Sequence, residues 1–189
     1  MSHFRYIYAI FLALGINLST AHAADANSAA SERIIVREAI NALSQIKRVD
    51  GAHTHSGFDV PRYVSLKFGE VNGRQGPSTK HAALWQYQRR GMPLVVVAEM
   101  DIWRKVRDMH GDEAWVRTQA LSGKRMAVTL ENTAIRSKPK QNSYIKAAAP
   151  VDTLLELMEC KPDDWCHVKS KDGYKGWVKR SILWGAEPL

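Results

Sequence analysis

The chain has 189 residues, a formal charge of +8, 45% hydrophobic residues and 24% charged residues. This composition is typical of a folded protein and too apolar for a disordered one, and the length excludes a large multi-domain enzyme. With only two cysteines, the chain cannot form a disulfide-dense scaffold or a four-cysteine zinc module.

Residues 1–23 have the features of a secretory signal peptide. Arg5 precedes the short apolar run YIYAIFLAL, and Ala21–Ala23 supplies a small-x-small cleavage pattern. A membrane anchor is the alternative, but the run from Tyr6 to Leu18 is shorter than the roughly 20 apolar residues that a spanning helix needs. We therefore predict a periplasmic or secreted protein with no stable membrane insertion after cleavage. Export makes nucleic acid a poor partner for this basic chain.

Residues 24–60 are predicted to form an N-terminal linker with a helix. The helix is expected over residues 31–48, because four apolar residues follow helical spacing there, namely Ile35, Ala39, Leu43 and Ile46. Residues 50–57 (DGAHTHSG) read as linker. His53 and His55 could offer two imidazoles to a metal, but no third ligand is near in the sequence, so no metal site is predicted.

The remainder is predicted to contain two copies of one module, at residues 61–124 and 125–189, because the sequence matches itself at an offset of 62 residues. Tryptophan, glycine and proline positions among the matches make coincidence a poor explanation. The identical pairs are Arg74/Arg136, Pro77/Pro139, Asp101/Asp163, Trp103/Trp165, Val106/Val168, Gly111/Gly173, Trp115/Trp177, Val116/Val178, Leu121/Leu183 and Gly123/Gly185.

Each copy is predicted to consist of short strands separated by turns. In the first copy the strands are expected at residues 94–98, 101–107 and 114–117, with a turn at 108–112. The second copy repeats this pattern at residues 153–160, 165–169 and 176–179, with its turn at 170–173. Short strands without helical periodicity predict an all-β fold built from small closed or half-open barrels.

The first copy resembles the bacterial SH3-like domain family in four stretches, Val71–Pro77, Trp103–Gly111, Trp115-Val116 and Leu121–Gly123. The second copy resembles it from Cys160–Cys166 through Gly173–Val178 to Leu183–Gly185. The resemblance covers about residues 61–189. It implies two tandem small SH3-like barrels, and it implies binding to peptidoglycan or another envelope component.

Strand alternation suggests a ligand-binding face. Because side chains on a strand point alternately to opposite faces, the residues that share a face in the two copies are Trp103, Lys105 and Arg107, and Trp165, His167 and Lys169. The two tryptophans could line a recognition groove or pack against a neighbouring element. In the family, the tryptophan that Trp103 and Trp165 resemble lines the ligand groove, so these six residues are the predicted ligand site. For Trp115 and Trp177, packing is the favoured interpretation.

Cys160 and Cys166 flank a short hairpin loop, which brings them within reach of a disulfide. Export would place them in an oxidising compartment. A redox-active pair and two free thiols are the alternatives, but the spacing lacks the C-x-x-C geometry that lowers thiol pKa values. The sequence therefore predicts a structural disulfide. The aligned residues of the first copy are Ala98 and Arg104, so only the second hairpin is expected to be cross-linked.

The chain has no recognisable catalytic or nucleotide-binding motif, and after the signal peptide and two modules no room remains for a separate catalytic domain. We therefore expect a non-enzymatic binding module without a cofactor. The expected partner is peptidoglycan, through its stem peptides, or another envelope component. An adaptor that binds an envelope protein is the second hypothesis, and a small hydrolase with an unrecognised site is the third.

Overall fold

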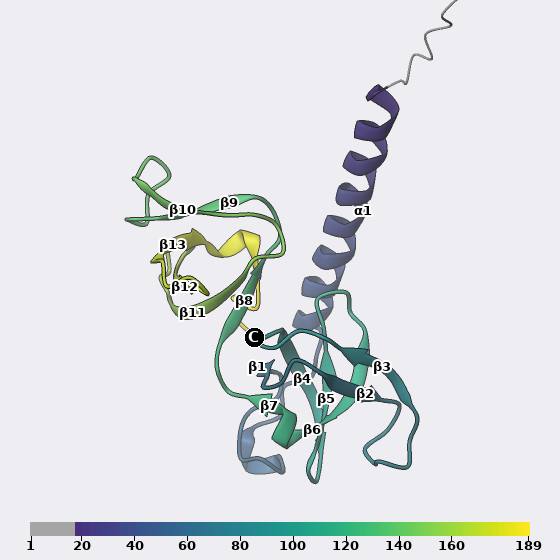
Figure 1. The fold of residues 1–189 in the computed structure, drawn as a ribbon. Helices are drawn as coiled ribbons and strands as arrows, with labels where there is room; N and C mark the ends of the chain where they lie inside the picture. Colours follow the sequence, from purple (N-terminus) through teal and green to yellow (C-terminus); the bar gives the residue numbers. More distant parts are fainter. Residues whose placement is uncertain (1–17) are drawn as a thin grey trace, which may run out of the picture. The chain divides into compact units, whose positions relative to one another are not determined.

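The computed structural model describes residues 18–189, which form one long helix and two antiparallel sheets (Figure 1). The predicted signal peptide, residues 1–23, lies largely outside the described residues. Among the residues that are described, no helix combines the length and the apolar character needed to cross a membrane.

The helix α1 runs from Leu18 to Ser44, so the predicted helix is confirmed, although it begins and ends earlier than expected. From Arg33 onward it belongs to the same compact unit as both sheets. Its buried side chains are Val36, Ala39 and Leu43. Ile35, which was expected in this stripe, is 45% exposed, so the predicted stripe is wrong by one position at its start.

The first repeat forms a seven-stranded sheet with the order β3-β2-β6-β5-β4-β1-β7. A 3-10 helix, η2 (Thr118–Ala120), joins its last two strands. The strands are β1 (Arg62–Leu66), β2 (Val71–Arg74), β3 (Ala83–Tyr87), β4 (Pro93–Met100), β5 (Trp103–Arg107), β6 (Glu113–Arg117) and β7 (Leu121–Ser122).

The second repeat forms another seven-stranded sheet with the equivalent order, β10-β9-β13-β12-β11-β8-β14. The 3-10 helix η3 (Arg180–Ile182) takes the place of η2. Its strands are β8 (Met126–Thr129), β9 (Thr133–Arg136), β10 (Ile145–Ala149), β11 (Leu154–Cys160), β12 (Trp165–Ser170), β13 (Lys175–Lys179) and β14 (Leu183–Trp184). The predicted all-β architecture with two tandem copies is confirmed.

The predicted repeat extends to individual backbone hydrogen bonds. In the first hairpin turn the Gly111 amide donates to the carbonyl of Asp108, and in the second the Gly173 amide donates to Ser170. Both glycines have a φ of 89°, in the left-handed region that glycine adopts without the steric cost of a Cβ. The predicted strand at 101–107 begins only at Trp103.

Each repeat encloses its own core. In the first sheet six strands, β1 to β6, send buried side chains into one cluster, which includes Leu94, Val106 and Val116. The second sheet has the corresponding cluster around Leu155, Val168 and Val178. Because so many strands face one cluster, each sheet must curl around its core.

A third cluster joins the two repeats to the helix. Trp184 from β14 is fully buried, and it packs with Tyr63 of β1 in an edge-to-face arrangement with ring centroids 6.3 Å apart. The same cluster contains Val95 of β4 and the buried face of α1. The repeats are therefore not independent: residues of the helix and of both sheets share one core.

The segment expected to be a linker is tied to the first repeat. A 3-10 helix, η1 (Gly51–His53), begins after Asp50, whose carboxylate accepts a hydrogen bond from the Ala52 amide at 2.8 Å. Farther along, the amide and the hydroxyl of Ser56 donate to Glu99 of β4 at 3.0 and 2.8 Å. The linker interpretation of residues 50–57 is thus wrong for this part of the chain.

Candidate functional site

One row of directly opposed residues crosses each sheet, with a tryptophan at its centre. Opposed residues of an antiparallel pair point to the same face, so the members of a row lie side by side. We call these the first and second tryptophan rows. The first consists of Ala83, Arg74, Trp115, Lys105 and Ala98, and the second of Ile145, Arg136, Trp177, His167 and Glu159.

Both rows lie on the face of the sheet opposite to the core. Val116 and Val178, which follow the central tryptophans, are 0% and 1% exposed and belong to the cores. Since adjacent residues on a strand point to opposite faces, Trp115 and Trp177 point outward. Both indoles are half-buried, which leaves part of each ring available to a ligand.

The cations of the first repeat are paired with an acid on the same face. Glu113 accepts hydrogen bonds from the Nε and Nη2 atoms of Arg107 at 2.9 and 2.6 Å. It also forms an ion pair with Lys105. Burial alone would raise the pKa of Glu113, but the hydrogen bonds from Lys105 and Arg107 outweigh it and lower that pKa. Lys105 and Arg107 therefore already have an acid partner within the repeat.

Cationic and aromatic groups gather on Trp177 in the second repeat. The Lys161 ammonium lies 4.6 Å from the centroid of the Trp177 ring, within the range of a cation–π interaction. The His167 ring lies on the same indole, with centroids 4.9 Å apart and a tilt of 36°. Arg136, the neighbour in the row, donates to the carbonyl of Ser143 at 3.0 Å. This arrangement combines an aromatic surface with hydrogen-bond donors.

Trp103 and Trp165, which are predicted to line a ligand groove, are largely buried. The two residues are only 6% and 8% exposed, although they lie on the outer face as alternation predicted. In each repeat a 3-10 helix, η2 or η3, begins beside the start of the strand that carries the tryptophan. The Thr118 amide donates to the carbonyl of Ile102, and the Arg180 amide donates to the carbonyl of Asp164. Their burial favours the packing alternative, and a direct role in ligand binding stays a prediction.

The other predicted ligand residues have different surroundings. Lys105 and Arg107 are engaged with Glu113, whereas His167 contacts Trp177. Lys169 is half-buried and lies opposite Glu156 of β11.

Sequence reasoning missed four cations beside the central tryptophans. Arg74 and Arg136 are identical at the repeat offset, and that match could have identified them. Lys161 and Lys175 have no such signal, because the residues at the same offset in the first copy are Glu99 and Glu113.

In each hairpin two opposed residues next to the loop are bonded to each other, by a disulfide in the second repeat and by an ion pair in the first. Cys160 and Cys166 are cross-strand partners joined by a disulfide, with Cα atoms 3.9 Å apart, so the predicted disulfide is confirmed. In the first repeat the partners at this place are Glu99 and Arg104, whose Oε1 and Nε atoms form an ion pair at 3.1 Å. The disulfide lies in the second hairpin, as expected, and an ion pair that was not expected lies at the same place in the first.

Reduction of the disulfide is expected to lower the free energy of unfolding by about 2 kcal/mol, the chain-entropy value for so short a loop. Non-reducing mass spectrometry should show Cys160 and Cys166 in one linked peptide. Denaturant unfolding with and without a reductant measures the stability change. The double variant Cys160→Ser/Cys166→Ala is the control, since a reductant should not affect it. Complete labelling of both thiols in the protein purified from the periplasm would contradict this prediction.

Replacing Glu99 by glutamine is expected to cost about 3–5 kcal/mol at pH 7, because the Arg104 side chain, 8% exposed, would stay buried without its partner. Burial alone would raise the pKa of Glu99, but hydrogen bonds from Arg62 and Ser56 lower it overall. The contribution of Glu99 to the free energy of unfolding is therefore fully present above the ordinary glutamate pKa of about 4.3. It is lost as the pH falls through the lowered pKa of the folded protein. Urea unfolding from pH 3 to 7 should show a shallower acid decline in Glu99→Gln; equal declines would exclude this role.

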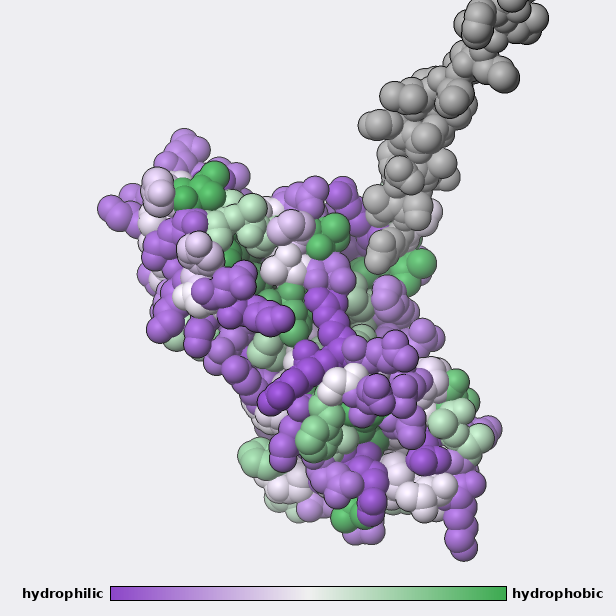
Figure 2. All heavy atoms as spheres, in the orientation of Figure 1, coloured by the Kyte–Doolittle hydropathy of each residue, from purple (hydrophilic) through white to green (hydrophobic). Residues whose placement is uncertain are grey.

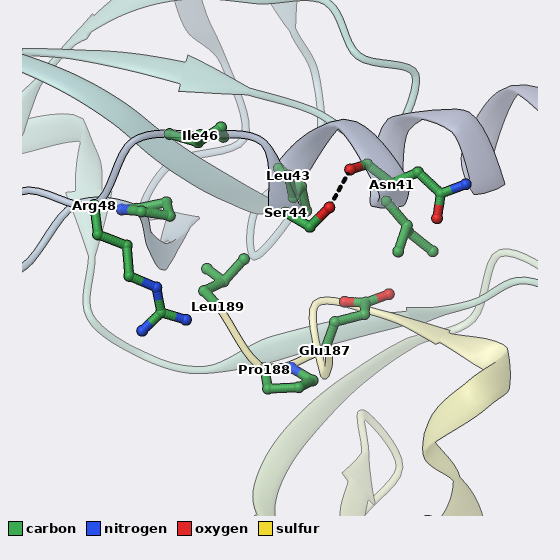
Figure 3. Close-up of a pocket in the computed structure, with 10 residues that line it drawn as sticks. Asn41, Leu43, Ser44, Ile46, Arg48, Glu187, Pro188 and Leu189 are labelled. Atoms are coloured by element: carbon green, nitrogen blue, oxygen red, sulfur yellow. Dashed lines mark hydrogen bonds between the residues drawn. The ribbon is translucent and has the colours of Figure 1, made fainter.

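A pocket of about 380 Å³ lies between the end of α1 and the C-terminal residues Glu187–Leu189 (Figure 3). Two of its polar side chains, those of Glu187 and Ser44, make hydrogen bonds. Glu187 accepts hydrogen bonds from the Tyr63 hydroxyl at 2.7 Å and from the Gly185 amide at 2.9 Å, and the Ser44 hydroxyl donates to the Asn41 carbonyl. Burial raises the pKa of Glu187.

The comparisons with known proteins bear on the family. A profile of the family described as Bacterial SH3 domain matches residues 67–123 and 130–185. No curated protein matches the chain significantly. Solved structures with some similarity include NlpC2 and NlpC1 from Trichomonas vaginalis, at 13% and 12% identity and a TM-score of 0.31 in each case. These alignments cover 66% of this chain and 48% and 45% of those chains. This chain thus spans about half their length, and so weak a likeness carries no functional argument.

The two profile matches together span more than half of the chain, and each falls on one of the two sheets with the same strand order. The chain therefore belongs to the bacterial SH3 domain family and carries two tandem SH3-like domains.

Proposed function

We propose that this protein is a non-enzymatic binding module of the bacterial cell envelope and that its ligand is peptidoglycan. Domains of this family are commonly cell-wall-binding modules. The predicted signal peptide would bring the protein to the periplasm or the exterior, where peptidoglycan lies.

The observation that carries the proposal is the tryptophan row, which recurs in both repeats. In each row a half-buried indole lies between an arginine and a second nitrogen-bearing side chain. An indole offers a large rigid surface against which a sugar ring or a peptide can pack. The flanking cations can bind carboxylates, which the stem peptides of peptidoglycan carry.

The surface character favours a polar ligand. On the face drawn in Figure 2, hydrophilic residues cover most of the surface, and hydrophobic residues occur in small separate groups. A large apolar patch, the usual mark of a stable protein–protein contact, does not stand out on that face. This favours an envelope polymer over the adaptor hypothesis.

Co-sedimentation of the purified protein with purified sacculi tests the proposal. We expect saturable binding that weakens with moderate salt, because charged contacts exposed to solvent are screened. A second protein of similar size and charge serves as the control for nonspecific adsorption. Absence of saturable binding to sacculi would refute the proposal and favour the adaptor function.

A further inference from the structure

The two tryptophan rows differ in charge at positions that correspond through the repeat. Glu113 of the first repeat corresponds to Lys175 of the second, both at the repeat offset and in strand pairing, where they lie opposite Arg107 and Lys169. This exchange replaces an acid by a base beside the row. Lys161 adds a further cation at Trp177. The two faces therefore have the same fold but do not present the same charges.

In the first repeat two of the cations on the face of Trp115 are engaged in ion pairs. Glu113 holds Lys105 and Arg107, whose side chains are 36% and 19% exposed. Glu99 is 3% exposed and bonded to Arg62 and Arg104, so it is withdrawn from the surface. A ligand anion at Trp115 would have to displace Glu113 from Lys105 and Arg107. The loss of these ion pairs would reduce the free energy gained by binding.

In the second repeat the corresponding cations lack such partners. Among the side chains that the structure describes, no acid lies within ion-pair distance of Lys161, Lys169 or Lys175. Lys161 is held over the Trp177 ring.

Two acids of β11, Glu156 and Glu159, face this side of the sheet. Glu156 is bonded to Lys124 at 2.9 Å, and that hydrogen bond is the main cause of its lowered pKa, to which Lys169 and Lys175 add only at longer range. Glu159 lies opposite His167, at the end of the row. The acids therefore leave Lys161 and Lys175 available.

We propose that the second repeat is the carboxylate-binding site of the protein and that the first repeat, though alike in fold, is not. A ligand carboxylate would approach Trp177 between Lys161 and Lys175, with the indole against the apolar part of the same ligand. This inference deepens the proposed function, because it assigns the anionic part of peptidoglycan to one of the two rows.

The test exchanges the charges that distinguish the rows. Lys175→Glu gives the second row the acid of the first, and it should weaken binding to sacculi and to a short oligo-L-glutamate by about tenfold. Lys175→Arg, which keeps the charge, should bind as the wild type does. Glu113→Lys, which frees Lys105 and Arg107, should strengthen binding to oligo-L-glutamate severalfold. Lys175 is exposed and forms no ion pair with an acid in the described part of the chain, so its replacement should leave the fold intact.

The control for net charge is Lys47→Glu. Lys47 is an exposed residue just after α1, so this variant carries the same charge change outside both rows and should bind within twofold of the wild type. Sacculi whose carboxylates have been amidated should lose the Lys175-dependent part of the binding.

The outcomes separate the two proposals. If Lys175→Glu and Lys47→Glu bind oligo-L-glutamate equally, the assignment of the carboxylate site is wrong, even if sacculi are bound. Equal binding to native and amidated sacculi would likewise overturn it and would point to phosphate groups or uncharged parts of the wall. If sacculi are not bound but oligo-L-glutamate binding depends on Lys175, the carboxylate site stands and peptidoglycan is not the ligand.

Discussion

Replacing Trp184 by alanine is expected to lower the free energy of unfolding by about 3–5 kcal/mol, the usual cost of truncating a buried aromatic. The residue is 0% exposed and packs with Tyr63 of the first repeat and with the buried face of α1. Removal of its ring would leave a cavity where the helix and both repeats meet. Denaturant unfolding followed by fluorescence and circular dichroism measures the change. The loss should affect both repeats, because both contribute to this core.

Trp184→Phe is the matched variant. The indole N–H of Trp184 has no hydrogen-bond partner in the described part of the chain, so a phenyl ring gives up no hydrogen bond there. It should retain part of the edge-to-face packing against Tyr63, and its stability loss should be about 1–2 kcal/mol. If Trp184→Ala is no less stable than Trp184→Phe, the shared core does not hold the repeats together.

Trp165→Ala is expected to destabilise the protein by about 3–5 kcal/mol as well, because its ring is 8% exposed. Any loss of binding should then follow the loss of folded protein. Trp177→Ala is the control, since it removes the same side chain from the neighbouring strand at a half-buried position. It should cost clearly less stability. A small stability loss in Trp165→Ala, with loss of binding by the folded protein, would restore the groove that the family resemblance implies.

The repeat, three strands of each copy and the disulfide were predictable from the sequence, because each leaves a pattern in the order of the residues. The match of tryptophan and glycine positions at one offset predicted two copies with one fold. Alternation separates Trp103 and Trp165 from Val106 and Val168, which the structure places in the cores. Alternation assigns a residue to a face of the sheet but does not say what covers that face. Alternation therefore placed Trp103 and Trp165 on the correct face but could not decide between a groove and packing, and their burial favours packing.

Two other errors have equally specific causes. Ile35 and Val36 are adjacent apolar residues, so helical spacing alone could not decide which of them faces the core. The ion pair of Glu99 and Arg104 was missed because the second hairpin loop is one residue longer than the first. A constant offset then aligns Cys160 with Ala98, whereas the pairing of the strands aligns it with Glu99.

The differing charges of the rows are visible in the sequence, but their meaning depends on contacts. The change from Glu113 to Lys175 can be read at the repeat offset. Only the structure shows that Glu113 forms ion pairs with both Lys105 and Arg107. The exchange of Glu113 for Lys175 therefore removes an acid partner from the face of the second repeat.

The most direct test of the account is the affinity for sacculi of the double variant Trp115→Ala/Trp177→Ala, measured together with its melting temperature. If the tryptophan rows bind the envelope polymer, the dissociation constant should rise by about thirtyfold or more, which corresponds to the roughly 2 kcal/mol of an aromatic anchor, and the protein should stay folded at the temperature of the assay. Wild-type affinity in a folded double variant would contradict the assignment of the binding site to these rows.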